Sequence, residues 1–252
     1  MGVQFETLEN FYTPHVGLLW DSLDRNRYPT FEEVAPIFTP EKLEKDAFIL
    51  FDNKPMMPRI WFINEHKDTI LQFQRDRFLC NWRKYTTDSI LEKDYPRYEG
   101  VKKEFYDSIE NLEKCLSDLK ISTINPQRLE LTYINVVPMD AIGGLSHIGS
   151  ILKDATWHAE HQVLKTPHKM SANWQFPVKE INSLLDLRIA SVPLPLTGQD
   201  ALRIELTVYG QAPYKSIKEC ESWFDAARRT IVTGFVDITT LDAHNMWGLS
   251  YE

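Results

Sequence analysis

Cysteine and glycine are scarce in this chain of 252 residues, which contains three cysteines and 10 glycines. The cysteines (Cys80, Cys115 and Cys220) are far apart and no Cys-x-x-Cys motif occurs, which argues against a disulfide framework, a zinc knuckle or a redox pair. The sequence also has no Walker phosphate loop and no dinucleotide-binding glycine fingerprint. We therefore expect no cofactor, and no reaction follows from these motifs.

Long apolar runs are absent too. No stretch approaches the ~20 apolar residues that a membrane-spanning helix needs, and residues 1–10 have neither a basic region nor an apolar signal core. We therefore expect a cytoplasmic protein with no membrane association. Acidic residues exceed basic ones by 36 to 28, a formal net charge of −8, which disfavours non-specific nucleic-acid binding.

Apolar residues are plentiful, at 43% of the chain, and 12% of residues are aromatic, enough for a sizeable core. In the first part of the chain, their spacing predicts a strand over 3–7, a helix over 9–25, an irregular connection through Pro29, Pro36 and Pro40, an antiparallel meander over 59–64, 70–74 and 78–83, and an amphipathic helix over 98–119. The second part predicts a strand over 129–137, a weaker helix over 148–164, strands over 172–176, 185–191 and 202–209, a helix over 215–232 and a short capped helix over 239–247.

This order of elements predicts an α+β protein with a curved antiparallel sheet and helices on one face. Strand, helix, three-strand meander and helix occur twice, which suggests two similar βαβββα halves, residues 1–125 and 126–252, sharing one continuous sheet. Such a duplication resembles the saddle topology of the TATA-binding-protein fold, a likeness that carries no function. An unduplicated α+β domain is the alternative.

Several motifs together resemble those of a sporadically distributed family of bacterial proteins of about 250 residues with no assigned activity. The most specific are Gln-x-Gln-Arg-Asp-Arg-Phe at 72–78 with Asn-Trp-Arg at 81–83, and Asp-x-Thr-Thr at 237–240 with His244 and Trp247; the others are 16–20, 27–29, 95–98 and 131–135. The resemblance covers nearly the whole chain and implies no catalytic residues. Sporadic distribution is typical of accessory genes such as defence or toxin–antitoxin modules.

Basic and aromatic side chains gather around the first meander. Arginine combined with aromatic rings can bind phosphate, a base or an acidic protein surface. The candidate binding residues are Arg75, Arg77, Asn81, Trp82, Arg83 and Arg97. The alternative is structural: Arg75 and Arg77 flank Asp76 in a tight hairpin turn, while Asn81 and Trp82 fix the sheet.

Three further clusters have weaker signals. His158 and His161, with His168 nearby, fail the His-Glu-x-x-His spacing of zinc proteases, so we expect a polar helix face and no metal; a pH-sensitive cluster is the alternative. Ser146 lies between Gly144 and Gly149, one position from a nucleophile elbow, and is more simply a helix N-cap. Asp237 and His244 could form an acid–base pair, although capping by Thr239 or Thr240 over a core-anchoring Trp247 is favoured.

These features favour a non-catalytic binding or regulatory protein with a protein partner, antitoxin-like within a bacterial defence or stress module. One alternative is a small-molecule-binding protein or enzyme with a pocket between sheet and helices, whose polar groups would include Tyr133, Asn135, His158 and His161. A second alternative is a nucleic-acid-binding subunit that uses the arginine and aromatic residues of the meander.

Overall fold

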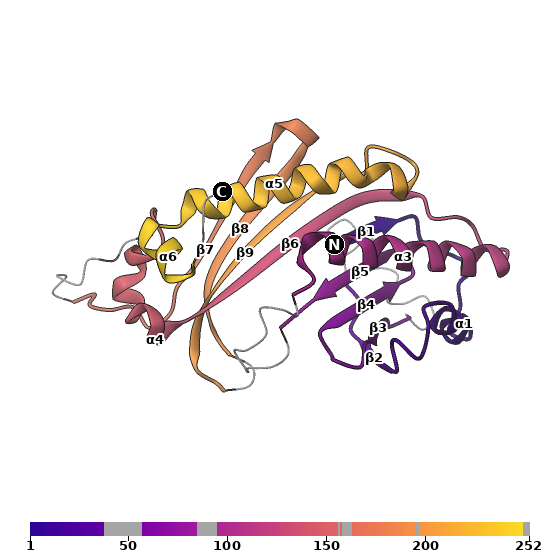
Figure 1. Ribbon diagram of the computed structural model, residues 1–252, viewed down its shortest axis with the longest axis horizontal. Coiled ribbons are helices and arrows are strands. Elements are labelled where there is room, and N and C mark those ends of the chain that lie inside the picture. The colour runs from indigo at the N-terminus through magenta and orange to yellow at the C-terminus, as the bar shows by residue number, and fades with distance from the viewer. Residues whose placement is uncertain (38–56, 85–94, 156, 158–162, 195–196, 249–252) are drawn as a thin grey trace. The chain divides into compact units, whose positions relative to one another are not determined.

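The computed structural model describes residues 1–37, 57–84, 95–155, 157, 163–194 and 197–248. These residues form an α+β protein with an open antiparallel sheet in the order β2-β3-β4-β5-β1-β6-β9-β8-β7, which confirms the predicted fold class (Figure 1). The strands are β1 Gly2–Phe5, β2 Thr30–Val34, β3 Arg59–Ile63, β4 Thr69–Gln74, β5 Arg77–Trp82, β6 Pro126–Pro138, β7 Ser171–Val178, β8 Ser183–Pro193 and β9 Asp200–Gln211.

The α-helices are α1 His15–Ser22, α3 Arg97–Asp118, α4 Met139–Ile142, α5 Glu221–Ile238 and α6 Leu241–Met246, with 3-10 helices η2 Leu145–Ser150, η3 Lys179–Ile181 and η4 Ile217–Cys220. Within the described residues, no helix is long and apolar enough to cross a membrane. The chain forms two compact units: the first contains residues 1–129 and 214–219, and the second contains 130–213 and 220–252. The predicted division into halves at residue 125 stays a prediction.

In the first unit, the long helix α3 covers one face of the sheet. The predicted apolar stripe of this helix is buried, and its Phe105 ring lies 6.3 Å from the Phe78 ring of β5. Phe78 is directly opposite Phe73 of β4, so both side chains are on the face toward α3. Trp20 of α1 reaches the same face, with its ring 6.5 Å from Phe62 of β3.

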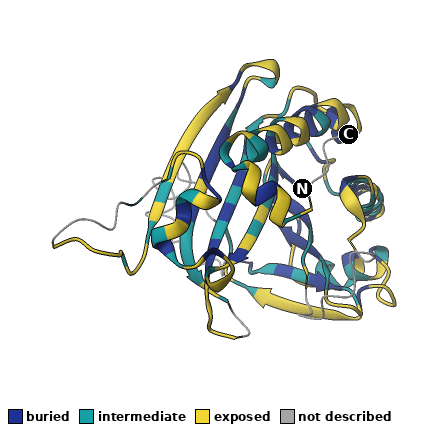
Figure 2. Cartoon of the chain, turned by 60° about the vertical axis from the view of Figure 1, so that its left-hand side comes forward, coloured by how far each residue is buried: buried dark blue, intermediate teal, exposed yellow. Residues whose placement is uncertain are grey.

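In the second unit, α5 covers one face of strands β8 and β9. A Cβ at Gly234 of α5 would lie 3.6 Å from Leu185 and 3.7 Å from Leu206, so the helix is in direct contact with the strands. Buried and less buried residues alternate along β9, as period-two packing requires (Figure 2). The face opposite α5 therefore carries the polar residues of these strands.

Three predicted elements differ from the structure. The first helix is limited to α1 because Pro14 is its N-cap and Asp24 has a left-handed φ of 67° just beyond it. The connection through Pro29 and Pro36 contains strand β2, because residues 30–34 pair in full register with β3 between the two prolines. The described part of 148–164 is helical only to Ser150, because Leu152 forms a β-bridge with Thr239 beyond α5.

Candidate functional site

The predicted cluster around the first meander does not form one site, because the side chains of β5 alternate between two faces. Arg77 and Asn81 lie on the face away from α3, whereas Trp82 shares the α3 face and packs against Tyr95, with tilted rings whose centroids are 4.7 Å apart. Arg97 is exposed at the start of α3. The structure therefore separates Trp82 and Arg97 from the other predicted binding residues.

Arg75 and Arg83 have structural contacts. Arg75 lies in the predicted hairpin turn, and it donates through Nε to the carbonyl oxygen of Leu8 at 3.2 Å and through Nη2 to that of Glu9 at 2.6 Å. Arg83 donates through Nε to the carbonyl oxygen of Lys67 at 2.9 Å. These bonds hold neighbouring loops to the meander.

Arg77 belongs to a polar face that the sequence patterns did not reveal. We define the arginine face as the side of the first unit's sheet that is turned away from α3. Gln74 of β4 and Gln4 of β1 are both direct register partners of Arg77, and Trp61 of β3 is the partner of Gln72. Side chains two apart on a strand share a face. Glu32 of β2 is in turn the partner of Trp61. The polar and aromatic residues of the arginine face are Gln4, Glu32, Arg59, Trp61, Gln72, Gln74, Arg77 and Asn81.

The centre of the arginine face is buried although it is polar. Gln72, Gln74 and Arg77 are 5%, 8% and 7% exposed. The Gln74 amide bonds the backbone of Ile37 twice, as donor at 3.0 Å and as acceptor at 2.8 Å, and it also donates to Asp76 at 2.9 Å. Asp76 accepts a longer bond of 3.4 Å from Arg77 Nε. The amide groups and Asp76 therefore hold this end of the face in place.

Three buried N–H donors on the arginine face have no hydrogen-bond partner in the part of the chain that the structure describes: Arg59 Nε, Arg77 Nη2 and Trp61 Nε1. Arg59 does bond Gln72, where Nη1 donates to Oε1 at 2.9 Å, and its guanidinium lies 5.6 Å from the Trp61 ring. Burial, and next the positive charge of Arg77, lower the pKa of Arg59. Two neighbouring cations thus keep unused donors away from water, where each costs about 1–3 kcal/mol.

The corresponding side of the second unit's sheet has its charges compensated. Arg188 is opposite Glu205 in register and lies 3.4 Å from Asp186, and Arg203 forms an ion pair with Glu205. A shallow hollow of about 250 Å³ lies over these strands, lined by both arginines and by Asn173. Arginine on a polar sheet face is therefore not unusual in this chain. Arg77 is likewise 3.4 Å from a carboxylate, that of Asp76, and the arginine face differs in its buried guanidinium donors without a partner among the described residues.

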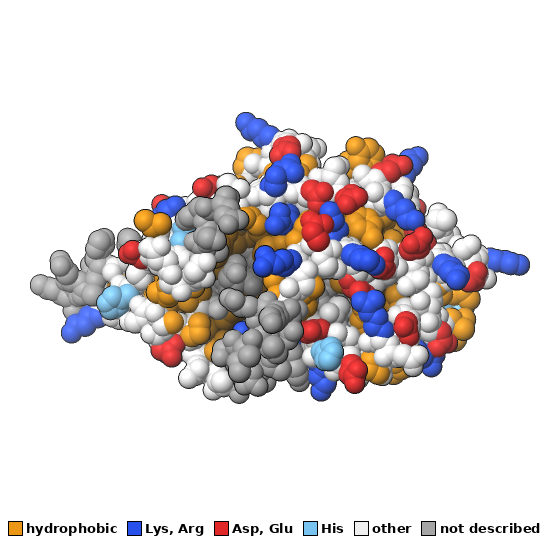
Figure 3. Space-filling model, viewed as in Figure 1, with side chains coloured by type: hydrophobic (Ala, Val, Ile, Leu, Met, Phe, Trp, Pro, Cys, Tyr) orange, Lys and Arg blue, Asp and Glu red, His pale blue; other side chains and the backbone are white. Residues whose placement is uncertain are grey.

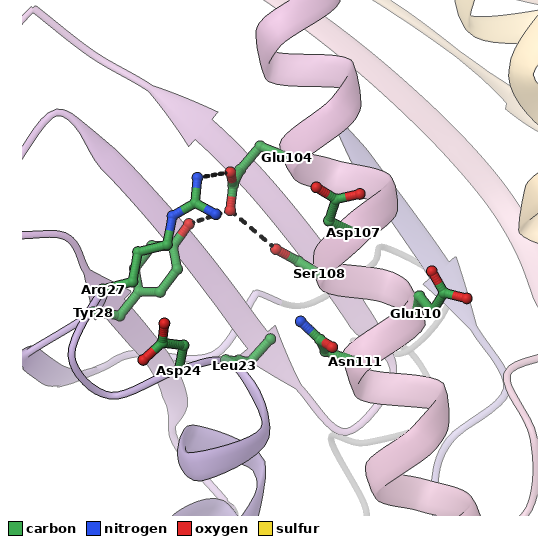
Figure 4. Close-up of a pocket in the computed structure, with 9 residues that line it drawn as sticks. All are labelled: Leu23, Asp24, Arg27, Tyr28, Glu104, Asp107, Ser108, Glu110 and Asn111. Atoms are coloured by element: carbon green, nitrogen blue, oxygen red, sulfur yellow. Dashed lines mark hydrogen bonds and ion pairs between the residues drawn. The ribbon is translucent and has the colours of Figure 1, made fainter.

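A second hollow, of about 350 Å³, lies between α3 and the loop after α1 (Figure 4). Its centre is Glu104, which accepts a 2.5 Å bond from the Tyr28 hydroxyl, an ion pair from Arg27 and a 3.4 Å bond from Ser108. Burial and the Glu104 carboxylate raise the pKa of Tyr28 far above its usual range. Because Glu104 and Tyr28 satisfy each other, this hollow is best explained as a structural connection between the loop and α3.

The nucleophile elbow suggested for Ser146 is not formed. Ser146 lies inside η2, whose N-cap is Gly144 without a side-chain cap bond, so the N-cap prediction for Ser146 is also wrong. His147 Nδ1 is 3.1 Å from Ser146 Oγ and 3.0 Å from the carbonyl oxygen of Gly143. Because a carbonyl only accepts, the bond to Gly143 requires a proton on Nδ1, and in that tautomer this nitrogen cannot act as a base for Ser146.

At the C-terminal end, the capping prediction is confirmed. Thr240 is the N-cap of α6 and its hydroxyl accepts a 3.1 Å bond from Ala243 N. His244 is buried, with Nε2 2.6 Å from the Thr239 hydroxyl, which itself donates to the carbonyl oxygen of Phe235. Trp247 is half-buried against Phe235, with ring centroids 5.6 Å apart. These bonds give His244 a structural role at the end of α5.

Of the remaining predicted residues, the structure describes only Tyr133 and Asn135. Tyr133 and Asn135 are half-buried on β6 and line neither of the two hollows. His158 and His161 lie outside the described residues. Among the described residues, no group of three or more His, Cys, Asp or Glu side chains is placed to hold a metal ion. On the view in Figure 3, Lys and Arg are interspersed with Asp and Glu, so no acidic patch is evident there.

Sequence reasoning missed Gln4, Glu32, Arg59, Trp61, Gln72 and Gln74, which complete the arginine face. One signal was available: Gln72 and Gln74 alternate with Leu71 and Phe73 in a strand, which indicates a polar face opposite the core. Comparisons with protein-family models, with curated proteins and with solved structures gave no match.

Proposed function

We propose that this chain is a non-catalytic binding protein that recognises an anionic group through the arginine face. The observation that carries the proposal is the pair of buried guanidinium donors, Arg59 Nε and Arg77 Nη2, without partners in the described part of the chain. A guanidinium buried without its full set of bonds is costly, so a fold that keeps two of them on one face of a sheet has a reason to do so. Binding of an anion supplies that reason.

The chemistry of the face supports binding over catalysis. Its buried unused groups are all donors, and arginine stays protonated in proteins, so neither Arg59 nor Arg77 is suited to accept a proton. The carboxylate of Asp76 is itself buried and engaged with Gln74 and Arg77. Such a set holds and orients an anion and offers no nucleophile to it.

We further propose a regulatory role with a protein partner, in a bacterial cytoplasmic defence or stress module. The formal net charge of −8 and the resemblance to the sporadically distributed family support this wider role.

The duplication also stays a proposal. Strand order supports it. In the first half, β1 neighbours β5, the last strand of the meander, and α3 follows β5 in the chain. In the second half, β6 neighbours β9 in the same way, and α5 follows β9. The first half has an added strand, β2.

The test is calorimetric titration of the full chain with sulfate, phosphate and acetate. Ionic strength is kept constant, and a titration with chloride is the reference. We expect saturable binding of at least one oxyanion by the unmodified protein and at least a tenfold loss in Arg77→Gln. The matched control is Arg203→Gln, which removes an ion-paired arginine from the second unit and should leave binding unchanged. Equal binding by both variants, or no binding by the unmodified protein, would overturn the proposal.

A further inference from the structure

The last strand of the sheet, β7, pairs with β8 on one side, and no strand among the described residues pairs with its other side. We propose that this edge is a docking surface for a second copy of the chain, whose own β7 pairs with it antiparallel about a two-fold axis at Asn173. The surface belongs to the second unit and does not involve the arginine face. Backbone direction, side-chain size and charge each favour this occupant.

The backbone of β7 presents hydrogen-bonding groups at the edge of the sheet. Ser191 N of β8 donates at 3.0 Å to the carbonyl oxygen of Met170, the residue just before β7. Successive residues of a strand direct their N–H and C=O groups to opposite sides, so every second residue from Met170 onward faces β8. The groups that face away from β8 therefore belong to Ser171, Asn173 and Gln175.

A ladder of two copies centred on Asn173 uses all of these groups. Asn173 then lies opposite Asn173 of the second copy, and Ser171 lies opposite Gln175 in both directions, so each residue exchanges N–H and C=O bonds with the other chain. Pro177 is the next outward residue and has no N–H, and it lies beyond this ladder. A ladder centred further along the strand would include Pro177 and lose a bond at each end.

Side-chain size along β7 is complementary to itself. Trp174 and Phe176 are 38% and 43% exposed, on the same face as Leu185, which is opposite Phe176 and contacts α5. In the proposed ladder, Trp174 lies opposite Ala172 of the second copy, and Phe176 lies opposite Met170. Each large ring thus packs against a small or a flexible side chain, an arrangement that two copies of one strand satisfy in both directions.

Charge also allows two copies to meet along β7. None of the eight residues of β7 is charged, whereas the five residues of β2, the strand at the other end of the sheet order, include Glu32 and Glu33. Charged residues are a common protection of edge strands against pairing with another chain. Two chains of net charge −8 repel each other at long range, and an uncharged strand places no like charges opposite each other at the point of contact.

The exposed area of β7 predicts a weak dimer. A large aromatic side chain buries about 150–250 Å² when fully enclosed, so the exposed fractions of Trp174 and Phe176 leave roughly 60–110 Å² each to bury. The strand has eight residues, fewer than the roughly 20–30 per partner of a standard stable interface. We therefore expect a transient dimer that forms at high protein concentration.

The first test is sedimentation of the full chain at protein concentrations up to about 1 mM. It is carried out in about 0.1 M and about 1 M salt, between which the screening length falls from about 10 to about 3 Å. We expect a monomer–dimer equilibrium whose association constant rises with salt, because salt screens the repulsion between the acidic chains and leaves backbone pairing and ring burial in place. A chain that stays monomeric in both salts would overturn the proposal and leave the edge to a strand of another protein.

Two variants of one residue then identify the strand. Asn173→Pro removes one outward N–H and leaves the bonds to β8 in place, so it should lower the association constant at least tenfold. Asn173→Ser keeps that N–H and should dimerise as the unmodified chain does. Equal dimerisation by the two variants would show that the copies meet through a different surface, and the proposal would be wrong.

Disulfide trapping tests the register without disturbing the strand. Two Asn173→Cys chains would have these Cα atoms about 5.5 Å apart, within the range of a disulfide, and the native cysteines are buried. Ser171→Cys is the matched control, because its two copies would be four residues apart along the ladder, about 14 Å. Oxidation should link the Asn173→Cys chains and not the Ser171→Cys chains; the reverse result would contradict the proposed pairing.

Discussion

Arg59 and Arg77 lie on the same face of the first unit's sheet, on the two strands that flank β4, and each keeps a buried N–H donor without a partner among the described residues. Nearly every other buried donor in a folded protein is satisfied. Local rules of folding are most often violated at functional sites, where the cost is offset by binding. The relationship between these two arginines therefore gives the first prediction.

Replacing Arg59 by methionine should hardly change the stability of the ligand-free protein. The change removes a partly buried cation that repels Arg77, but it also removes the 2.9 Å bond from Arg59 to buried Gln72. Because these two effects offset each other, we expect the free energy of unfolding to change by less than about 1 kcal/mol. Urea denaturation measures this. The control is Arg203→Met, which removes an ion pair with Glu205 from an arginine side chain that is 42% exposed, and the change should be below about 1 kcal/mol. A loss above about 2 kcal/mol in Arg59→Met would show that Arg59 is structural.

Removing the Tyr28 hydroxyl should destabilise the first unit. Tyr28 is 1% exposed and donates a 2.5 Å bond to the Glu104 carboxylate, so Tyr28→Phe should cost about 1.5–3 kcal/mol. The matched control is Arg27→Gln, which removes the other partner of Glu104 from a side chain that is 56% exposed and should cost less than about 1 kcal/mol. The reverse order in urea denaturation would mean that the ion pair, not the hydroxyl, holds the loop to α3.

Stability should fall above pH 9. Burial raises the pKa of the Cys80 thiol from 9.0 to about 12, and Tyr28 is shifted in the same direction. Between those values the unfolded chain releases the Cys80 proton while the folded chain keeps it, so the unfolded state binds fewer protons and the free energy of unfolding decreases as pH rises. Urea denaturation from pH 8 to 11 measures the slope. Cys80→Ala should be less stable at pH 8 and have a shallower slope; parallel curves would exclude Cys80 as a cause.

Two glycine-to-alanine changes should have opposite effects. A Cβ at Gly210 of β9 would lie 2.1 Å from Ser183 Oγ and 2.9 Å from its Cβ, and Ser183 accepts a 3.1 Å bond from the indole of buried Trp223. Gly210→Ala should therefore cost about 1–3 kcal/mol and change the Trp223 fluorescence. Gly17→Ala in α1 meets only the flexible end of Arg25 at 3.6 Å, and it should stabilise by up to about 1 kcal/mol. Destabilisation by both changes would contradict this account.

The elements and the general class of fold follow from local patterns in the sequence. The apolar stripe of α3 has spacings of three and four residues, and β9 alternates apolar and polar residues, so each can be assigned from its own residues. The hairpin at 75–76 and the Thr240 cap also depend only on neighbours along the chain. Each of these features is a local interaction, which is why the sequence alone determines it.

Contacts between distant segments decided the rest. Strand β2 exists because β3 pairs with it, and the helix expected over 148–164 is interrupted because Leu152 pairs with Thr239. The arginine face depends on register, because Arg59 and Arg77 are 18 positions apart and a shift of one residue would turn either side chain to the opposite face. The sequence by itself determined the polar and apolar alternation of each strand; only the pairing of the strands placed the two arginines on one face.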